Sequence, residues 1–411
     1  MTTVDKQPGA MEPDGRYAWW RLVAALGLST IGGIGLWSVV VALPAIQTEF
    51  GVDRSGASLP FTATMIGFAI GGVLMGRFSD RFGVRMPITL GSLMLGAGYI
   101  AAASATTMWQ FILAQAVMIG MLGSSSTFGP LVADVTLWFV KRRGIAVAIV
   151  ASGNYLAGTV WPPILQYAIE TIGWRQAHMG IGVFCVVTML PLSLCLRHRP
   201  DIEKAGRGSG SVEMLTQTRL SPKTLQVLVM VAGLACCIAM SMPQVHIVAY
   251  CGDLGYGVAR GAEMLSLMLG FGIISRLASG FIADRIGGLN TLILGSALQF
   301  SALLFYLPFN GLTPLYIVSA FFGLAQGGIV PSYALIIREY FPARDAGARL
   351  SLVLMTTIVG MAAGGWISGE IYDLTGSYRA AFLNGIAWNL VNLAIAFWLL
   401  AGQVRSKAVT S

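Results

Sequence analysis

The 411-residue sequence is poor in charged side chains. Only 11% of its residues are Asp, Glu, Lys or Arg, whereas 55% are hydrophobic and the mean hydropathy is +0.73. Soluble domains carry about 25% charged residues, so this composition excludes an ordinary soluble domain. It indicates a protein that crosses a membrane many times. The 51 glycines suit such a protein, because small residues let helix backbones approach closely in lipid.

Residues that carry metal or nucleophilic chemistry are also scarce. The five cysteines and three histidines form no metal-spaced cluster, and an odd cysteine count within apolar runs indicates free thiols. The sequence contains no nucleophile elbow and no phosphate-binding loop. We therefore expect no bound metal, no cofactor and no enzymatic activity. Residues 1–17 are polar and lack the apolar stretch of a signal peptide, so the first membrane helix would direct insertion itself.

Apolar runs of about 20 residues, the length that crosses a hydrocarbon core of about 30 Å, recur twelve times. They lie near 19–45, 59–78, 87–105, 109–137, 144–167, 177–196, 225–251, 262–283, 289–308, 313–338, 347–369 and 380–402. The long polar segment 197–224 separates six runs from the other six. The sequence thus predicts an all-α membrane protein with an N-terminal six-helix bundle (1–196), a linker (197–224) and a C-terminal six-helix bundle (225–411).

The distribution of lysine and arginine predicts the orientation in the membrane. Twenty-one of the 26 basic residues fall on the side that holds both termini and the linker. Four arginines fall on the other side (Arg54, Arg175, Arg260 and Arg379), and Arg276 falls within an apolar run. The positive-inside rule therefore places both termini and the linker in the cytoplasm. The net charge of +8 then reflects topology, and no nucleic-acid partner is expected.

The two halves of the sequence are related by an internal repeat at an offset of 204 residues. The matching pairs are Gly76–Gly83 with Gly280–Gly287, Gly173–Arg175 with Ser377–Arg379, and Glu49 with Asp253. Parallel repeats of six helices, with a binding site between them near the middle of the bilayer, are typical of major facilitator carriers.

The segment Gly76–Arg85 resembles the loop signature of the major facilitator superfamily, and a degenerate copy occupies Gly280–Gly287. The resemblance implies a conformational latch at the cytoplasmic helix ends, whose charged residues exchange partners as the two halves rock. The latch residues implied in this sequence are Gly76, Asp80, Arg81, Gly83, Asp284 and Arg285.

Two further segments, Asp14–Trp19 and Phe139–Gly153, resemble signatures of the monocarboxylate porters. The sequence is thus similar to the family of monocarboxylate porters and oxalate–formate antiporters, and within it to the bacterial branch. Arg276 lies on the eighth predicted helix, where that family carries a carboxylate-binding arginine. A charge at this depth costs at least about 2.5 kcal/mol and requires a polar cavity or an anionic partner. Arg276 is accordingly the first substrate-binding candidate. The alternative is a structural arginine that bonds backbone carbonyls.

The sequence departs from animal members of that family at two functional positions. An acid one turn before the arginine is replaced by Gly272, and a lysine in the first helix is replaced by Trp37. Any coupled proton therefore needs another site. His246 and Asp253 share one face of the seventh helix and are the candidates, since His titrates near neutral pH and burial raises the pKa of an acid. Asp253 has Glu49 as its repeat counterpart, so it is alternatively part of the scaffold.

Uncharged polar residues at mid-depth complete the predicted site. They are Ser125 on the fourth helix, Asn154 and Tyr155 on the fifth, and Gln326 and Tyr333 on the tenth. A pocket for a small ligand needs a few such groups on apolar walls, although serine also serves in ordinary helix packing. Asp134, which shortly precedes Lys141, Arg142 and Arg143, is expected in a cytoplasmic charge network.

These features predict a secondary active transporter of a small monocarboxylate or related organic anion, working by alternating access as a symporter with protons or as an anion exchanger. Its partners would be the carboxylate, a proton or counter-anion, and lipid, and we expect a monomer in a bacterial inner membrane. One alternative is a multidrug or other proton antiporter, which would need a buried acid. Another is a transporter-like anion sensor, which would need a cytoplasmic signalling domain.

Overall fold

The computed structural model describes residues 14–139, 142–197, 221–341 and 343–410, and these residues form helices joined by short connections. Twelve helical segments are long and apolar enough to cross a membrane. They overlap all twelve predicted runs, so the prediction of an all-α, twelve-helix membrane protein is confirmed. Most of the predicted linker 197–224 lies outside the described residues.

Four of the twelve spans are interrupted. The first consists of α1 (Arg16–Gly32) and α2 (Ile34–Phe50), and the fourth of α5 (Met108–Leu113), η1 (Ala114–Gly123), η2 (Ser124–Thr127) and α6 (Gly129–Trp138). The fifth consists of α7 (Arg143–Ala151) and α8 (Gly153–Ile172), and the tenth of α13 (Leu312–Gln326) and α14 (Ile329–Tyr340). The continuous spans are α3 (Arg54–Phe82), α4 (Arg85–Ala103), α9 (Trp174–Leu194), α10 (Pro222–Asp253), α11 (Val258–Ile286), α12 (Gly288–Phe305), α15 (Ala343–Thr375) and α16 (Tyr378–Thr410).

The 204-residue repeat recurs in the backbone conformation. Gly51 directly follows α2 and its counterpart Gly255 lies two residues beyond α10, with φ of 60° and 81°. Gly83 and Gly287 directly follow α3 and α11, with φ of 83° and 81°. Residues with a side chain rarely adopt a positive φ, which explains why glycine occurs at these turns in both halves. The fourth and tenth spans also break at corresponding places, next to Gly123 and Gly327.

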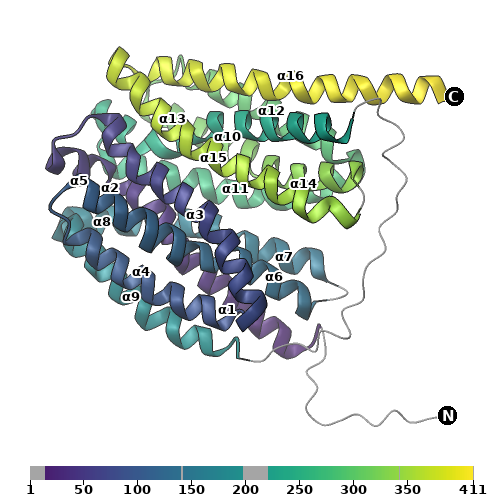
Figure 1. The fold of residues 1–411 in the computed structure, drawn as a ribbon. Coiled ribbons are helices and arrows are strands. Elements are labelled where there is room, and N and C mark those ends of the chain that lie inside the picture. Colours follow the sequence, from purple (N-terminus) through teal and green to yellow (C-terminus); the bar gives the residue numbers. More distant parts are fainter. Residues whose placement is uncertain (1–13, 140–141, 198–220, 342, 411) are drawn as a thin grey trace, which may run out of the picture.

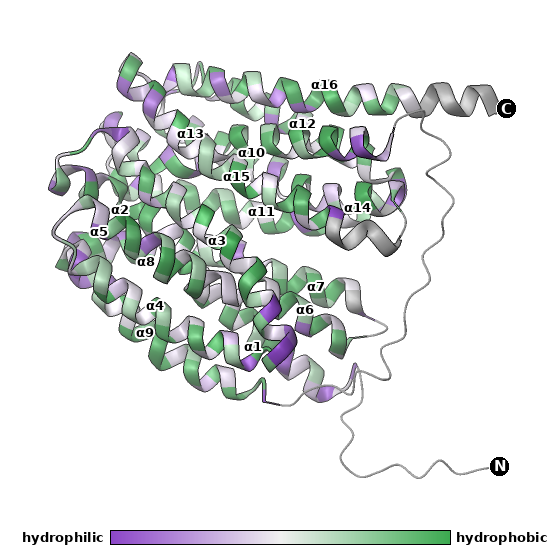
Figure 2. Ribbon diagram, viewed as in Figure 1, coloured by the Kyte–Doolittle hydropathy of each residue, from purple (hydrophilic) through white to green (hydrophobic). Residues whose placement is uncertain are grey.

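The elements α1–α9 form one bundle and α10–α16 form the other, with the two lying side by side (Figure 1). The halves meet through α3 with α15, α8 with α11, and α2 with α10. Hydrophobic residues run along the length of the helices, and hydrophilic residues gather towards their ends (Figure 2). We call the face at which α1 begins and α16 ends the terminal face, and the other the opposite face.

The halves touch from mid-depth to the opposite face and part towards the terminal face. Near the opposite face, Gly369 lies so close to the backbone of Ser55 that an added Cβ would approach its Cα to 2.9 Å. Deeper, the hydroxyl of Thr62 donates to the carbonyl of Ala362 across the interface. Towards the terminal face, a Cβ at Gly76 or Gly280 would meet nothing within 4 Å. The two bundles therefore enclose a space that opens at the terminal face.

A buried ion pair joins α1 to α6 inside the N-terminal half. Arg21 donates from Nε and Nη2 to the two oxygens of Asp134 at 2.8 and 2.7 Å, and stacks on Trp138. Arg21 is 2% exposed and Asp134 is 7% exposed. Asp134 is predicted to belong to a cytoplasmic charge network, and its partner among the described residues is Arg21, which occupies both carboxylate oxygens. Lys141 itself lies outside the described residues.

We expect Arg21→Met to destabilise the protein by about 3–5 kcal/mol, because it leaves the Asp134 carboxylate buried without its cation. The melting temperature of the purified protein measures this loss. Asp134→Leu added to Arg21→Met should restore most of it. Arg260→Met, which removes an exposed pair with Glu263, is the control and should leave the melting temperature unchanged. Equal melting temperatures for wild type and Arg21→Met would refute the assignment.

Candidate functional site

Arg276 is held where two helices are interrupted. Its Nη1 donates to the carbonyl of Ala151 at 3.0 Å, and its Nε donates to the carbonyl of Gly327 at 3.4 Å. Ala151 ends α7, and Gly327 follows the last residue of α13. Carbonyls at a helix end lack the partner that the next turn would supply, so they are available to an arginine. Because Ala151 belongs to the N-terminal half, this bond crosses between the halves.

The ring of Tyr155 lies beneath the guanidinium, whose central carbon is 4.4 Å from the ring centroid. Gly272 makes this possible. A Cβ at position 272 would lie 2.5 Å from Cε1 of Tyr155, so any larger side chain there would displace the ring. At the level of the missing acid, an aromatic ring from the other half thus packs against Arg276. The structure brings together two of the predicted substrate-binding residues, Arg276 and Tyr155.

The charge of Arg276 has no anionic counterpart among the described residues. Its acceptors are two neutral carbonyls and an aromatic face, and the ion pairs of the described chain involve other arginines. The side chain is half-buried and bonds one carbonyl of each half, so the guanidinium lies at the junction of the two bundles. The carbonyl bonds match the structural alternative for this arginine, but they leave its charge unneutralised.

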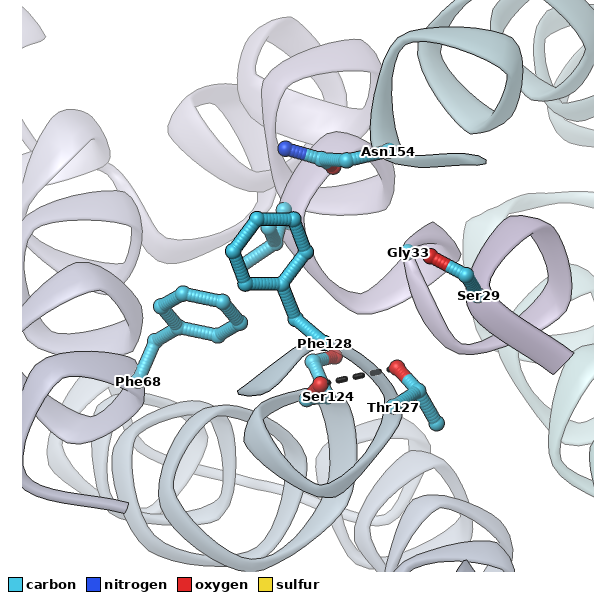
Figure 3. A pocket seen from close by; sticks show the side chains of 8 residues that line it. Ser29, Gly33, Phe68, Ser124, Thr127, Phe128 and Asn154 are labelled. Atoms are coloured by element: carbon cyan, nitrogen blue, oxygen red, sulfur yellow. Dashed lines mark hydrogen bonds between the residues drawn. The ribbon is translucent and has the colours of Figure 1, made fainter. Parts of the chain in front are cut away.

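A small pocket lies in the N-terminal half, one helical turn from the Ala151 carbonyl. Its lining residues come from four spans and are Ser29, Gly33, Leu36, Phe68, Ser124, Thr127, Phe128 and Asn154. The rings of Phe68 and Phe128 lie beside one another with their centroids 6.2 Å apart, and the Asn154 amide lies on the far side of Phe128 (Figure 3). Phe68, Phe128 and Asn154 are half-buried. The pocket therefore combines two aromatic rings with the polar side chains of Ser29, Ser124, Thr127 and Asn154.

Most polar groups of the pocket are engaged within the protein. Ser124 donates to the Gly32 carbonyl and Thr127 donates to the Ser124 carbonyl. Trp37, at the position of the missing lysine, donates from Nε1 to the backbone and side-chain oxygens of Asn154 at 3.1 and 3.3 Å. Within the described chain the Asn154 amide nitrogen keeps its two hydrogens free. The pocket thus offers a donor and contains no carboxylate.

The remaining predicted substrate-binding residues lie apart from this pocket. Ser125 donates to its own helix, to the Met121 carbonyl at 2.5 Å, and packs against Gly71 of α3. Tyr333 is fully buried within the C-terminal half and donates to Asn392. Gln326 is also fully buried and accepts from Gln244, while its Nε2 has no partner in the described chain. Gln326 directly precedes Gly327, whose carbonyl accepts from Arg276.

A gate of charged residues closes the opposite face. Nη2 of Arg54, at the start of α3, lies 2.9 Å from both oxygens of Asp253 at the end of α10. The carboxylate of Asp373 accepts from the backbone N–H groups of Arg54 and Ser55 at 2.9 and 2.7 Å. It therefore satisfies two of the unpaired N–H groups that begin α3, from the other half of the molecule. We call Arg54, Asp253 and Asp373 the outer gate.

The repeat counterpart of Asp253 has a different partner. Glu49 bonds Arg175 and Trp174 of its own half, with Nη2 of Arg175 at 2.7 Å. The two acids occupy equivalent positions, yet only Asp253 joins the halves. A purely structural acid would not need an ion pair with the other half, so the bond from Asp253 to Arg54 argues against the scaffold alternative.

His246 is fully buried behind the outer gate. Its Nε2 lies 2.7 Å from the Gly365 carbonyl, and its Nδ1 lies 3.2 Å from the hydroxyl of Tyr378. Because a carbonyl only accepts, Nε2 carries a hydrogen, and Nδ1 of a neutral ring accepts from Tyr378. The ring of Tyr378 also faces Arg54, whose central carbon lies 5.8 Å from its centroid. The structure thus links His246 to the gate through one tyrosine.

The predicted latch residues lie at the terminal face, at the ends of α3 and α11. Asp80, Arg81, Asp284 and Arg285 are exposed and form no ion pair within the described residues. Gly83 and Gly287 end the two helices, and the Cβ positions of Gly76 and Gly280 face open space. The latch side of the molecule is therefore open while the outer gate is closed.

Comparisons with known proteins agree with this architecture. The family model described as Major Facilitator Superfamily matches residues 25–318 and 290–410. A crystal structure of a bacterial homologue of the human lysosomal transporter Spinster, in an inward-facing and unoccupied conformation, superposes with a TM-score of 0.68 at 14% identity. It covers 95% of this chain and 96% of that one. A mutant of the nucleoside transporter NupG gives 0.69 at 14% identity, over 93% of this chain and 99% of its own.

Relatives with curated names are more similar in sequence. Monocarboxylate transporter 13 of Bos taurus is 25% identical over 403 residues, which is 95% of this chain and 91% of the relative. The MFS-type transporter opdF of Penicillium oxalicum is 26% identical over 401 residues, which is 93% of this chain and 91% of the relative. The chain therefore matches transporters of two different descriptions over nearly its whole length.

Proposed function

We propose a function from the premise that this chain belongs to the Major Facilitator Superfamily of transporters: it is a secondary active carrier of a small monocarboxylate or related organic anion. The observation that carries the proposal is the charge of Arg276, which has no anionic partner among the described residues and lies at the junction of the two halves. A cationic drug would meet this positive charge and no carboxylate in the neighbouring pocket, so the antiporter alternative is disfavoured.

The carboxylate would enter from the open terminal face and accept hydrogen bonds from the guanidinium in the bidentate geometry that arginine favours. In doing so it would neutralise the charge and take the place of the Ala151 carbonyl, which now bonds Nη1 across the halves. Losing this bond would free α11 to move relative to α7. Substrate binding and the rocking of the halves would thus be linked through one side chain.

Asp253 and His246 are the proposed coupling residues. Protonation of Asp253 would remove its charge and weaken the ion pair with Arg54, so that a proton would help the outer gate to open. His246 would respond through Tyr378, which it contacts at 3.2 Å. We further propose that the terminal face is cytoplasmic, as the distribution of basic residues favours, that the carrier resides in a bacterial inner membrane, and that it acts as a monomer.

A ligand screen followed by flux measurements tests the proposed function. Purified protein is melted with and without acetate, lactate, pyruvate, oxalate and benzoate, and then reconstituted into vesicles. At least one carboxylate should raise the melting temperature, and its uptake should rise when a pH gradient or an internal counter-anion is imposed. Binding without flux would favour the anion sensor, and raised stability with organic cations alone would favour the antiporter.

A further inference from the structure

The 204-residue repeat shows which residues of one half have no similar residue at the equivalent position of the other half. Arg276 of α11 corresponds to Gly72 of α3, and Phe68 of α3 corresponds to Gly272 of α11, each at the offset of 204 residues. Scaffold residues recur in both halves, as the helix-ending glycines Gly83 and Gly287 do. A ring in one half and a charge in the other, each matched by glycine, therefore indicate a site with two chemically different ends.

The face of α3 that bears Phe68 borders free space. Gly72 lies one turn further along the same face, and a Cβ added there would meet nothing within 4 Å. Phe68 is partly exposed and lines the small pocket with Phe128, with no packed helix covering the two rings completely. Phe68 precedes Gly72 by four residues, which is a rise of about 6 Å along the helix axis. The apolar body of a ligand would therefore contact the rings about 6 Å from the level of Gly72.

The charged end of the site lies on the other side of Asn154. Asn154 lines the pocket, and Tyr155 next to it carries the guanidinium of Arg276 on its ring. Ala151, which bonds the guanidinium, ends α7 three residues before Asn154, and Asn154 lies in the first turn of α8. The segment Ala151–Tyr155 therefore contributes to the contacts of Arg276 and, through Asn154, to the pocket that holds the two rings.

We propose that the substrate is a carboxylate with a flat apolar body, such as an arylcarboxylate, with its carboxylate on Arg276 and its ring against Phe68 and Phe128. This inference rests on the proposed function and narrows it from small carboxylates in general. Two aromatic rings favour an offset or edge-on contact with a third ring, and the pocket contains no charged group that such a ring would have to desolvate.

The test compares ligands that differ only in the body attached to the carboxylate. Acetate, lactate, cyclohexanecarboxylate, benzoate and phenylacetate are titrated into the full-length purified protein, and their dissociation constants are measured by calorimetry. Benzoate or phenylacetate should bind at least about ten-fold more tightly than acetate or lactate, and more tightly than cyclohexanecarboxylate.

Variants locate the preference within the protein. Phe68→Leu and Phe128→Leu should each reduce the advantage of the aryl ligand by about ten-fold and change acetate binding less than two-fold. Phe281→Leu, on the exposed surface of α11, is the control and should leave both unchanged.

Three outcomes would overturn the inference. Acetate or lactate that binds as tightly as benzoate would refute an aryl substrate and leave the proposed carrier function standing. An aryl preference that survives in the double variant Phe68→Leu/Phe128→Leu, with the melting temperature unchanged, would show that other residues hold the ring. A protein that binds none of these carboxylates would overturn the proposed function together with this inference.

Discussion

Replacing Arg276 by glutamine should lower the uptake rate of the best-bound carboxylate by about 100-fold at subsaturating concentration. Two charge-assisted hydrogen bonds to a carboxylate contribute about 3 kcal/mol, and 1.4 kcal/mol corresponds to a factor of ten. Arg276→Lys keeps the charge but loses the planar fork, so its loss should be smaller, about ten-fold. The measurement is initial uptake into vesicles that contain equal amounts of correctly inserted protein.

Two controls separate recognition from folding. The carbonyls of Ala151 and Gly327 lose a donor in Arg276→Gln, so the melting temperature without ligand must be measured with the transport rate. Arg260→Gln removes an exposed arginine whose partner lies in its own half and should transport as wild type does. Full transport of every carboxylate by a stable Arg276→Gln protein would show that this arginine is structural.

Replacing Arg54 by alanine should open the outer gate. The variant loses the ion pair with Asp253 and the stacking on Tyr372 and Tyr378, at 4.9 and 5.8 Å. Each of these contributes roughly 0.5–1 kcal/mol at a partly exposed site, so the opening equilibrium should shift by roughly 2 kcal/mol, or about 30-fold. Asp253→Asn keeps the stacking of Arg54 on the two tyrosines, so it should shift the opening equilibrium by only about five-fold.

Thiol labelling measures this opening. Phe61 is 1% exposed and touches Gly365 across the halves, so a cysteine introduced as Phe61→Cys is covered while the gate is closed. Cys195 is the exposed native cysteine and is first replaced by serine. The labelling rate at position 61 should rise with Arg54→Ala and, less, with Asp253→Asn.

Glu49→Gln is the matched control for the gate. It changes the repeat counterpart of Asp253, whose pair with Arg175 stays within one half, and it should leave the labelling rate at wild-type level. Equal rates in all variants would mean that the ion pair does not hold the halves together. A rise caused by Glu49→Gln as large as that caused by Asp253→Asn would mean that any acid at this face has the same effect.

Hydropathy and the repeat predict much of the fold. Twelve apolar runs are sufficient to identify twelve spans, because a helix that crosses lipid must be apolar over its whole length. The need of Arg276 for polar partners was also predictable, since a charge at that depth is costly without them, but its contact with Tyr155 was not. The glycine at position 272 signalled that the usual acid was missing, although not that an aromatic ring would take its place.

The partners of the functional residues were not predictable from local patterns. Arg54 and Asp253 are 199 residues apart and meet only when the two halves close at the opposite face. Phe68 and Phe128 read as ordinary apolar residues, because their periodicity is that of any membrane helix. The sequence places Ser125 in the site, whereas the pocket is lined by its neighbours Ser124 and Thr127. The irregular fourth span sets this orientation, and regular helical spacing does not reveal it.

Recognition of a substrate charge by Arg276 is the central proposal for this carrier, and a charge-removal cycle tests it most directly. The dissociation constants of the best-bound carboxylate and of its primary amide are measured by calorimetry for wild type and for Arg276→Gln. We expect wild type to prefer the carboxylate by about 100-fold and Arg276→Gln to prefer it by less than about three-fold. A preference for the carboxylate that remains undiminished in Arg276→Gln would contradict the account.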